Sequence, residues 1–382
     1  MSSPAALRII ETVADIPAAQ WNALAGSNPF LSHAYLRALQ ESGCATPRTG
    51  WQAQFLTLWQ DDSLVGAMPL YVKSHSYGEF VFDWAWAEAY QRQGLNYYPK
   101  WLCAVPFTPA TGPRLLASSP EARVQLIRFA LQLAQESGSS SLHCLFPDES
   151  QALEMEQQGM MLRRAVQFHW QNPGYADFDA YLSGMSHDKR KRIKQERRKV
   201  REAGIAFDRV RGENITPAQW DFFVRCYAHT HRQYRSPQPL NLDFFLRIGA
   251  AMPENILLVI ASRGGEPVAA ALNFFSRDTF YGRSWGALEY HPGLHFETCY
   301  YQAIEFCIER KIAVFEGGAQ GEHKLARGFL PVTTWSAHWL AHPEFARAVE
   351  DFLQRESRSI NQYVDELNDS NPFKQLPEKN SL

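Results

Sequence analysis

The chain has 382 residues, which is enough for two or three domains of ordinary size. Its hydrophobic fraction of 45% and charged fraction of 20% are typical of globular proteins and exclude wholesale disorder. The 38 basic and 40 acidic residues give a formal net charge of −2, which excludes a polycation that coats nucleic acid, so any basic site must be local.

The sequence also carries signs of its compartment. No uninterrupted apolar run reaches the roughly 18–20 residues that cross a bilayer, and the N-terminus, MSSPAALRII, lacks the basic and apolar regions of a secretory signal. The six cysteines form no CxxC pair, which argues against a disulfide framework or a zinc ribbon. We therefore expect a cytoplasmic protein with no integral membrane segment and no metal site.

The chain resembles itself at a spacing near 200 residues. The stretch around Trp21 recurs around Trp220, each time after a short apolar segment that predicts a strand and at the start of a predicted helix. The second copy opens with Thr216-Pro-Ala-Gln219, a capping box with proline at the first helical position. Segments 55–70 and 258–274 then each show two apolar runs about a polar turn, which predicts a β-hairpin.

The later elements follow in the same order in both copies. A further strand is expected in each, with Trp84 matching Trp285, and a helix and a short strand close each copy, at 129–146 and from 302 onward. Each half thus reads β-α-α-β-β-β-α-β, which predicts a mixed sheet flanked by helices. The first copy has about 30 extra residues, 88–121, whose prolines favour an ordered surface loop.

We therefore predict an α/β (α+β, mixed-sheet) protein made by duplication. The expected domains are residues 1–165 and 166–343, followed by an amphipathic helix and a frayed tail over 344–382. The alternative is that tryptophan and apolar segments recur by chance in a chain rich in aromatic residues.

A strongly basic helix is predicted over 187–203, within the second domain. Nine of the thirteen residues in KRKRIKQERRKVR, 189–201, are Lys or Arg, and only Ile193 and Val200 offer an apolar seam. A solvated helix linking the two halves is the plainer interpretation. The charge density in a nearly neutral chain instead favours a site for a diphosphate, a nucleotide or an RNA backbone. The candidate phosphate-binding residues are Arg190, Lys194, Arg197 and Arg201.

A turn from strand to helix is predicted at 289–297. The first N–H groups of such a helix attract anions, so His291 and His295 are candidate substrate-binding residues. A metal site is disfavoured, because Pro292 and Gly293 interrupt the helix that would bring the two imidazoles together.

The richest chemistry lies in the glycine-rich segment 316–329, which follows a predicted strand. Its glycines allow the backbone to approach a ligand closely, and open α/β sheets place their sites at such strand ends. Glu316, Glu322 and His323 are candidate proton acceptors, and Lys324 can bind an anion or stabilise an oxyanion. The expected ligand contacts of the segment are Gly317, Gly318, Gln320 and Arg327. The alternative is a polar surface turn with local ion pairs.

Three aromatic residues of the first half are candidate substrate-binding residues that line a cleft: Trp84, Trp86 and Tyr90. The alternative is that they belong to the core, as aromatic stripes more often do. The sequence contains no GxSxG elbow, no P-loop, no GxGxxG and no HExxH motif.

Four blocks carry a family resemblance: NPFLSHAYLRALQESG, PLYVKSHSYGEFVFDWAWAEAY, VPFTPATGPRLL and EGGAQGEHKLARGFLPV. With them, roughly residues 5–370 resemble the FemAB-like predicted N-acyltransferases, which are tandem GNAT-fold proteins similar to the Fem-type peptidoglycan-bridge aminoacyltransferases. The resemblance implies two GNAT-like domains and acyl transfer to an amine. In the Fem-type relatives, aminoacyl-tRNA is the donor and a peptidoglycan precursor the acceptor.

The resemblance leads to an expected function. We expect an N-acyltransferase that moves an activated acyl or aminoacyl group onto an amine, for which a peptidoglycan precursor or a peptide is the candidate acceptor. The donor, aminoacyl-tRNA or acyl-CoA, stays open, because EYHPGLHFE lacks the [QR]xxGx[GA] loop of CoA-dependent GNAT enzymes. The alternative is a non-catalytic GNAT-like module that binds a phosphorylated ligand or RNA.

Overall fold

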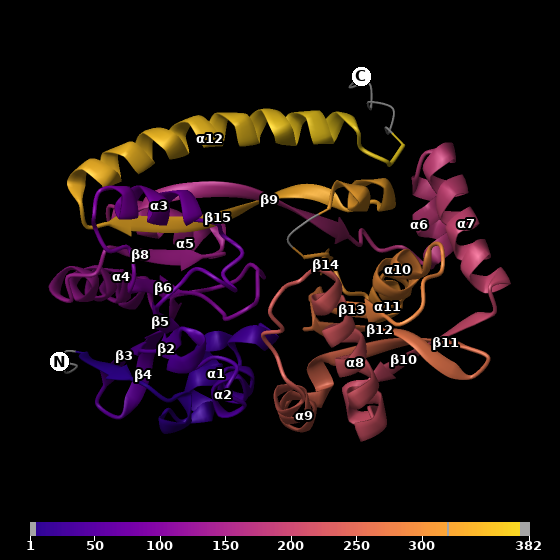
Figure 1. Cartoon of the computed structure of the whole chain (residues 1–382), viewed down its shortest axis with the longest axis horizontal. Helices are drawn as coiled ribbons and strands as arrows, with labels where there is room; N and C mark the ends of the chain where they lie inside the picture. The colour runs from indigo at the N-terminus through magenta and orange to yellow at the C-terminus, as the bar shows by residue number, and fades with distance from the viewer. Residues whose placement is uncertain (1–4, 319–320, 375–382) are drawn as a thin grey trace, which may run out of the picture. The chain divides into compact units, whose positions relative to one another are not determined.

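The computed structural model describes residues 5–318 and 321–374, which divide into two compact units (Figure 1). Unit 1 comprises Met1–Val166, Pro239–Met252 and Thr333–Gln362, and unit 2 comprises Gln167–Gln238, Pro253–Val332 and Tyr363–Leu382. The first division between the units falls between residues 166 and 167. Segments 239–252 and 333–343, which the sequence placed in the second domain, group with unit 1.

Unit 1 contains two sheets. The first has the order β1-β3-β4-β7: β1 (Ala6–Ile10), β3 (Phe55–Gln60), β4 (Ser63–Met68) and β7 (Leu116–Ala117). The second contains β2 (Trp51–Ala53), β5 (Leu70–Lys73), β6 (Lys100–Cys103), β8 (Ser141–Leu145) and part of β15 (Leu330–Leu340). Pro69, which has no N–H for a ladder, separates β4 from β5, and the chain passes from one sheet to the other there.

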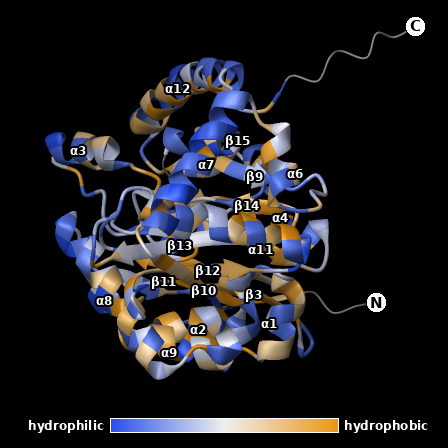
Figure 2. Ribbon diagram, turned by 90° about the vertical axis from the view of Figure 1, so that its right-hand side faces the viewer, coloured by the Kyte–Doolittle hydropathy of each residue, from blue (hydrophilic) through white to orange (hydrophobic). Residues whose placement is uncertain are grey.

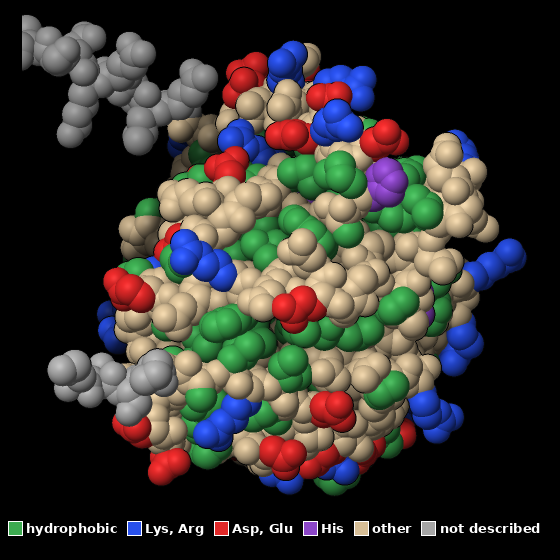
Figure 3. All heavy atoms as spheres, turned by 90° about the vertical axis from the view of Figure 1, so that its left-hand side faces the viewer, with side chains coloured by type: hydrophobic (Ala, Val, Ile, Leu, Met, Phe, Trp, Pro, Cys, Tyr) green, Lys and Arg blue, Asp and Glu red, His purple; other side chains and the backbone are tan. Residues whose placement is uncertain are grey.

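The helices of unit 1 cover these sheets. They are α1 (Ala18–Ala25), α2 (His33–Glu41), α3 (Trp84–Arg92), α4 (Pro120–Glu136), α5 (Glu149–Gln157), α9 (Leu242–Ala251) and most of α12 (Pro343–Asp369). Leu126 and Ile127 of α4 pack with Leu56 and Leu58 of β3 in the main core. Figure 3 shows one face of the molecule, on which basic and acidic side chains are interspersed among hydrophobic ones.

Unit 2 has one sheet of order β10-β11-β12-β13-β14-β9. Its strands are β10 (Ile205–Arg211), β11 (Ile256–Arg263), β12 (Glu266–Phe275), β13 (Thr279–Ala287), β14 (Val314–Glu316) and part of β9 (Met161–Gln171). The helices are α6 (Phe178–Gly184), α7 (His187–Glu202), α8 (Pro217–Gln233), α10 (Leu294–Phe296) and α11 (Gln302–Arg310), with the π-helical turn η6 (Glu297–Tyr301) between the last two and the 3-10 helix η7 (Glu322–Arg327) near the site. Shorter 3-10 turns are η1 (Val13–Asp15), η2 (Pro29–Leu31), η3 (Pro47–Thr49), η4 (Gly212–Asn214) and η5 (Pro253–Asn255).

Strands β9 and β15 each contribute residues to both units. In unit 2, His169–Gln171 of β9 pair antiparallel with β14. In unit 1, Ser336–Leu340 of β15 pair antiparallel with β8. Each of these segments follows directly, along an unbroken strand, from residues of the other unit.

The predicted fold class is confirmed, because each unit is a mixed sheet flanked by helices. In both, one strand pair is parallel, β6 with β8 in unit 1 and β13 with β14 in unit 2. Both predicted hairpins form, β3–β4 and β11–β12. The capping box at Thr216 is present. The expected C-terminal helix is α12.

Two expectations for the first half are wrong. Trp84 begins helix α3, whereas its expected counterpart Trp285 lies in strand β13. The stretch 88–121 is not only a loop, because it contains the end of α3, strand β6 and the short β7. Strand β6 pairs with β5 on one side and β8 on the other, so tertiary pairing outweighs the local proline signal there.

The basic helix α7 forms as expected. It begins after Ser186, whose side chain makes no capping hydrogen bond, and its buried residues are Ile193 and Val200. In Figure 2 its ribbon is mainly hydrophilic, whereas β12 and β14 of the same unit are largely hydrophobic.

Candidate functional site

The candidate site of unit 2 lies where β13 and β14 separate. Their parallel pairing covers three residue pairs and ends at Tyr281 and Glu316. Directly after this point, the register of β13 against β12 shifts, so that Arg283 is an extra residue in β13. Such bulges bend a strand and are common beside active sites. The two strands therefore part at the carboxyl end of β14, where the sequence placed its candidate residues.

The glycine-rich segment folds back over the end of β14. Gly318 has a φ of 84°, which glycine adopts without strain. Its carbonyl oxygen accepts a hydrogen bond of 3.0 Å from Nζ of Lys324. Lys324 is only 3% exposed, and this burial lowers its pKa to about 8. Glu316 is also buried, at the end of the strand. Gln320 lies outside the described residues.

An imidazole pair and a phenol meet beside this segment. The ring centroids of His323 and His295 are 6.0 Å apart, although the two residues come from different segments. Nε2 of His323 lies 3.2 Å from the hydroxyl of Tyr300, which belongs to the π-helical turn. We refer to His295, Tyr300 and His323 as the imidazole–phenol cluster.

The electrostatics of this cluster favour neutral groups. Burial, with Lys324 and Arg327 nearby, lowers the pKa of His323 below its ordinary value. Burial lowers the pKa of His295 to about 4, with smaller effects from His323 and both cations. Burial also raises the pKa of Tyr300. Near neutral pH, the imidazoles can therefore accept a proton and the phenol can donate one.

A hollow of about 500 Å³ extends from the cluster along the end of β13. Trp285, His295 and Phe296 line it, and the ring centroids of Trp285 and His295 are 4.6 Å apart. His291 also lines it, and its Nε2 lies 2.9 Å from Oε2 of Glu289. Both histidines that the sequence selected in this turn thus border one hollow.

Arg327 joins the basic helix to the candidate site. It is 1% exposed, and its guanidinium donates to both carboxylate oxygens of Glu196 in α7, at 2.8 and 2.9 Å. It also donates to the carbonyl oxygen of His323 at 2.7 Å. Tyr301 donates a hydrogen bond to the same Glu196. Arg327 therefore links the His323 backbone to Glu196 of α7, and its role in ligand binding stays a prediction.

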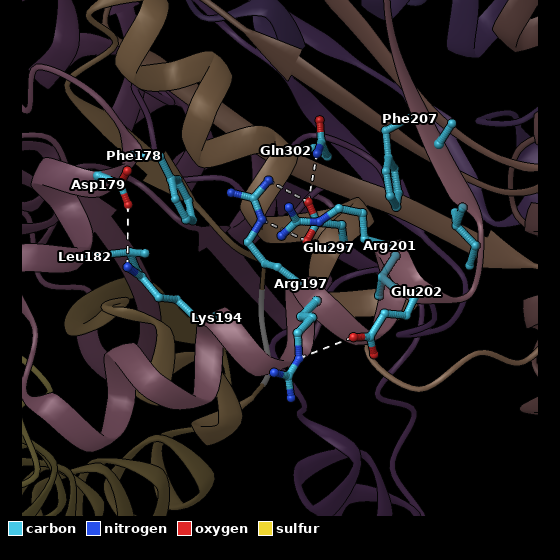
Figure 4. Close-up of a pocket in the computed structure, with 14 residues that line it drawn as sticks. Phe178, Asp179, Leu182, Lys194, Arg197, Arg201, Glu202, Phe207, Glu297 and Gln302 are labelled. Carbon is cyan, nitrogen blue, oxygen red and sulfur yellow. Dashed lines mark hydrogen bonds and ion pairs between the residues drawn. The ribbon is translucent and has the colours of Figure 1, made fainter.

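Arg197 is likewise engaged by carboxylates. Its guanidinium donates to Glu297 at 2.9 and 3.1 Å (Figure 4). It also donates to Glu305 at 2.7 Å. Burial opposes the charge of Arg197, but these two carboxylates outweigh it and raise its pKa. Gln302 donates a further hydrogen bond to Glu297. The ion pairs fasten α7 to the helix that carries Tyr300.

The other cations of α7 face open hollows. Lys194 and Arg201 line a groove of about 920 Å³ beside α6 and β10, in which Lys194 lies 3.8 Å from Asp179 (Figure 4). Arg190 and Lys194 line a second hollow of about 410 Å³ along α7. All four predicted phosphate-binding residues thus border hollows, because Arg197 also lines the larger groove, although its guanidinium is held by two carboxylates.

The remaining predicted residues have other surroundings. Glu322 is exposed and accepts a hydrogen bond of 2.6 Å from Tyr363, whose pKa burial and this carboxylate raise to about 12. In unit 1, Trp86 and Tyr90 are buried in a core with α12, where Tyr90 stacks on Phe345. Trp84 is 41% exposed.

Sequence reasoning missed Tyr300 and Glu196. Tyr300 lies five positions after His295, just beyond the predicted turn at 289–297, and its phenol hydroxyl is the signal that could have selected it. Glu196 lies among nine cations, and no local pattern connects it with Arg327.

The described residues were compared with the requirements for a membrane-spanning helix and for a metal site. None of their helices is both long and apolar enough to span a bilayer. Within the same residues, no group of three or more His, Cys, Asp or Glu side chains is placed to hold a metal ion.

Comparison with known proteins gives a family and a fold. The profile of the FemAB-like family, described as peptidoglycan biosynthesis/recognition, matches residues 12–375. A search of curated proteins finds no match. The match confirms the resemblance seen in the sequence and supports acyl or aminoacyl transfer linked to peptidoglycan.

Three solved structures share the fold. The C-terminal domain of a proposed lysylphosphatidylglycerol synthetase of Agrobacterium fabrum has a TM-score of 0.57 and 9% identity, covering 89% of this chain and 96% of its own. FemX has a TM-score of 0.54 and 10% identity, covering 88% and 98%. L-PGS of Bacillus licheniformis has a TM-score of 0.51 and 9% identity, covering 84% and 96%.

Proposed function

The chain belongs to the FemAB-like family, and on that premise we propose that it is an N-acyltransferase whose reaction takes place at the imidazole–phenol cluster of unit 2. An amine of a cell-wall precursor or peptide attacks the carbonyl carbon of an activated acyl or aminoacyl group. A C–N bond forms, and the bond from the carbonyl carbon to the oxygen or sulfur of the carrier breaks. The observation that carries the proposal is the meeting of His295, Tyr300 and His323 where β13 and β14 separate.

The proton of the attacking amine passes through two side chains. Neutral His323 accepts this proton, because its lowered pKa leaves a ring nitrogen free of charge near neutral pH. Tyr300 donates its hydroxyl proton to the leaving oxygen or sulfur and regains one from His323, 3.2 Å away. The net result is transfer of one proton from the amine to the leaving group.

The oxyanion of the tetrahedral intermediate needs aimed donors. Lys324 uses one N–H donor on the carbonyl of Gly318, and an ammonium has two further donors for a developing negative charge. Because Lys324 is almost fully buried, its charge acts in a medium that screens it weakly. We assign Lys324 to stabilisation of this oxyanion.

The donor carries phosphate groups that bind along α7. Arg190, Lys194 and Arg201 face the hollows along this helix, and their charges suit the polyanionic part of an aminoacyl-tRNA or of an acyl-CoA. The hollow lined by Trp285 and Phe296 then accommodates the acyl or acceptor group beside the cluster.

The test is a transfer assay with the full chain. Aminoacyl-tRNAs and acyl-CoA thioesters are offered with lysine-containing muropeptides as acceptors, and product is measured by mass spectrometry. We expect transfer with one donor class, and a loss of about 100-fold or more in kcat/KM for His323→Gln. Protonation of the acceptor amine lowers the kcat/KM of the wild type as pH falls below about 10. Protonation of His323 should add a second fall at pH values below the ordinary titration range of histidine, because only neutral His323 accepts the proton.

A matched control variant separates catalysis from folding. His231 of α8 bonds to Ser236 and lies outside the cluster, so His231→Gln should transfer at the wild-type rate. Absence of transfer with every donor, together with retained ligand binding, would instead support the non-catalytic module.

A further inference from the structure

Unit 1 contains a buried polar cluster that the proposed reaction does not use. Lys100 is 0% exposed, and its ammonium donates to Oγ of Ser76 at 2.8 Å, to Oε2 of Glu79 at 2.8 Å and to Oδ2 of Asp83. An ammonium has three N–H donors, so Lys100 has none left. We name Lys73, Ser76, Glu79, Asp83 and Lys100 the Lys100 cluster.

Two carboxylate oxygens of this cluster lack a donor. Glu79 is 4% exposed and Asp83 is 3% exposed. Among the described residues, neither Oε1 of Glu79 nor Oδ1 of Asp83 has a hydrogen-bond partner. Buried carboxylate oxygens normally accept hydrogen bonds, because leaving them bare is costly. Since both carboxylates bond to the same ammonium, the two bare oxygens belong to neighbouring groups.

The net charge of the cluster also favours the binding of one cation. Burial raises the pKa of Glu79 to about 7 and lowers that of Lys73 to about 7. Burial opposes ionisation of Asp83, but Lys100 outweighs it and lowers the pKa of Asp83 to about 2. As pH rises well above 7, Glu79 ionises and Lys73 becomes neutral, and the cluster approaches two carboxylates with one protonated lysine, a net charge of −1.

An irregular aromatic segment covers the cluster. Residues 74–83 between β5 and α3 have no regular structure, and Ser76, Glu79 and Asp83 belong to them. Phe80 adopts a φ of 63°, an uncommon conformation for a bulky residue that often marks functional sites. Tyr77 and Phe82 are each 60% exposed, and Phe80 and Trp84 are also exposed. Such rings attract cations at their faces.

We propose that the Lys100 cluster binds the primary ammonium group of a ligand, which donates hydrogen bonds to Oε1 of Glu79 and Oδ1 of Asp83. The exposed rings of residues 77–84 contact the hydrocarbon chain that carries this ammonium. A cation at this position satisfies the two bare oxygens and neutralises the excess charge. The binding does not depend on the transfer reaction in unit 2.

The test compares two probes that differ in one charge. Nα-acetyl-lysine amide carries the ammonium, and its Nε-acetylated form has nearly the same hydrocarbon chain without the charge. Binding to the full chain is measured by calorimetry and by thermal shift, since a ligand of the native state raises the melting temperature. We expect the charged probe to bind at least about tenfold more tightly than the acetylated one.

The binding of the charged probe should strengthen as pH rises through 7, because Glu79 must be ionised. The groups that act on Glu79 are Lys73 of β5, Lys100 of β6, Asp83 of its own segment, and Tyr97 and Tyr98. His143 of β8 and His338 of β15, farther along the same network, have strongly lowered pKa values and stay neutral over this range.

Variants then locate the site. Glu79→Gln should weaken binding of the charged probe about tenfold or more. Glu88→Gln, at an exposed ion pair of α3, should leave it unchanged. Equal affinity for both probes, no binding up to about 10 mM, or unaltered binding in Glu79→Gln would overturn the proposal and assign the two oxygens to water. The probe comparison in the wild type needs no variant, so misfolding of Glu79→Gln would not prevent a decision.

Discussion

Two neighbouring residues of the glycine-rich segment, His323 and Lys324, show how burial sets chemistry one side chain at a time. His323 is partly exposed and its imidazole reaches Tyr300, whereas Lys324 is almost fully buried and its ammonium bonds to Gly318. The pKa values of both are lowered, and in both cases burial is the largest cause. The consequence is a neutral base beside a buried cation whose charge is costly to the fold.

This cost leads to a prediction for Lys324→Met. The pKa of Lys324 is about 8 in the folded chain, below its unfolded value, so between these pH values the unfolded state binds more protons. Wild-type stability should therefore rise from pH 8 to pH 10. Methionine removes the buried charge, so we expect the variant to be about 2 kcal/mol more stable at pH 7, after loss of one hydrogen bond.

Urea unfolding at several pH values checks this prediction. The rise in stability above pH 8 should be smaller in the variant than in the wild type, with Lys73 still contributing to it, and the variant should lose most of its transfer activity. Lys311→Met, at an exposed helix end, is the control, with no change in the pH dependence of stability. A less stable Lys324→Met would show that the ammonium stabilises the fold on balance.

At the scale of elements, helix α7 has two faces. Glu196 on one face fixes the helix to the site through Arg327. The other face carries Arg190, Lys194, Arg197 and Arg201, which line hollows along the helix, and of these Arg197 is also held by Glu297 and Glu305. The same basic sequence thus supplies both ion pairs and cations that border hollows.

The ion pair between Glu196 on this fixed face and Arg327 predicts a large loss of stability for Glu196→Gln. The substitution leaves the guanidinium of Arg327, which is 1% exposed, without its carboxylate, and removing one partner of a buried pair costs about 3 kcal/mol. Glu202→Gln is the matched control, because its side chain is 66% exposed and such pairs contribute about 0.5 kcal/mol or less. The midpoints of urea unfolding measure both. Equal midpoints would show that Arg327 finds another partner.

The other face, which carries Arg190 and Lys194, predicts a change in salt dependence. Each phosphate contact contributes about 0.7–0.9 to the slope of log K against log salt, so replacing Arg190, Lys191 and Lys194 by Gln should lower the slope for tRNA by about 2 to 3. Fluorescence anisotropy with labelled tRNA at several salt concentrations measures this slope. Replacement of Arg225, Arg277 and Lys311 by Gln changes the net charge equally and should leave the slope unaltered. Identical slopes for the two triple variants would exclude α7 as the binding face.

At the scale of the whole molecule, strands β9 and β15, which contribute residues to both units, decide whether a fragment of the chain can fold alone. Unit 1 needs Ser336–Leu340 to pair with β8, and helix α9 of the same unit comes from the middle of the chain. A duplicated gene would be expected to yield two halves that fold independently, but here unit 1 takes residues 239–252 and 333–362 from the second half of the sequence.

We therefore predict that the fragment 1–166 does not fold alone. Without residues 333–340, the edge of β8 is unpaired, and open edges promote aggregation. The fragment should aggregate or lack a cooperative unfolding transition in calorimetry and gel filtration. Its coexpression with 167–382 should restore a soluble complex. A soluble fragment with cooperative unfolding would show that residues 333–340 are dispensable.

The sequence by itself determined the local elements and where the chemistry lies along the chain. Periodicity, caps and turns predicted the hairpins, α7 with its seam of Ile193 and Val200, and α12, because these signals act between residues close in sequence. The segments that contain His295 and His323 were also selected by composition alone. Charged residues and glycines close together in the sequence were sufficient to select these two segments.

Only the tertiary structure decided which of these residues meet. Contacts between distant parts of the sequence pair Glu196 with Arg327 and bring His323 to Tyr300. The pairing of β9 with β14 and the helical conformation at Trp84 also depend on such distant parts. Such contacts are set by packing and by the satisfaction of buried polar groups over the whole chain, which no local pattern encodes.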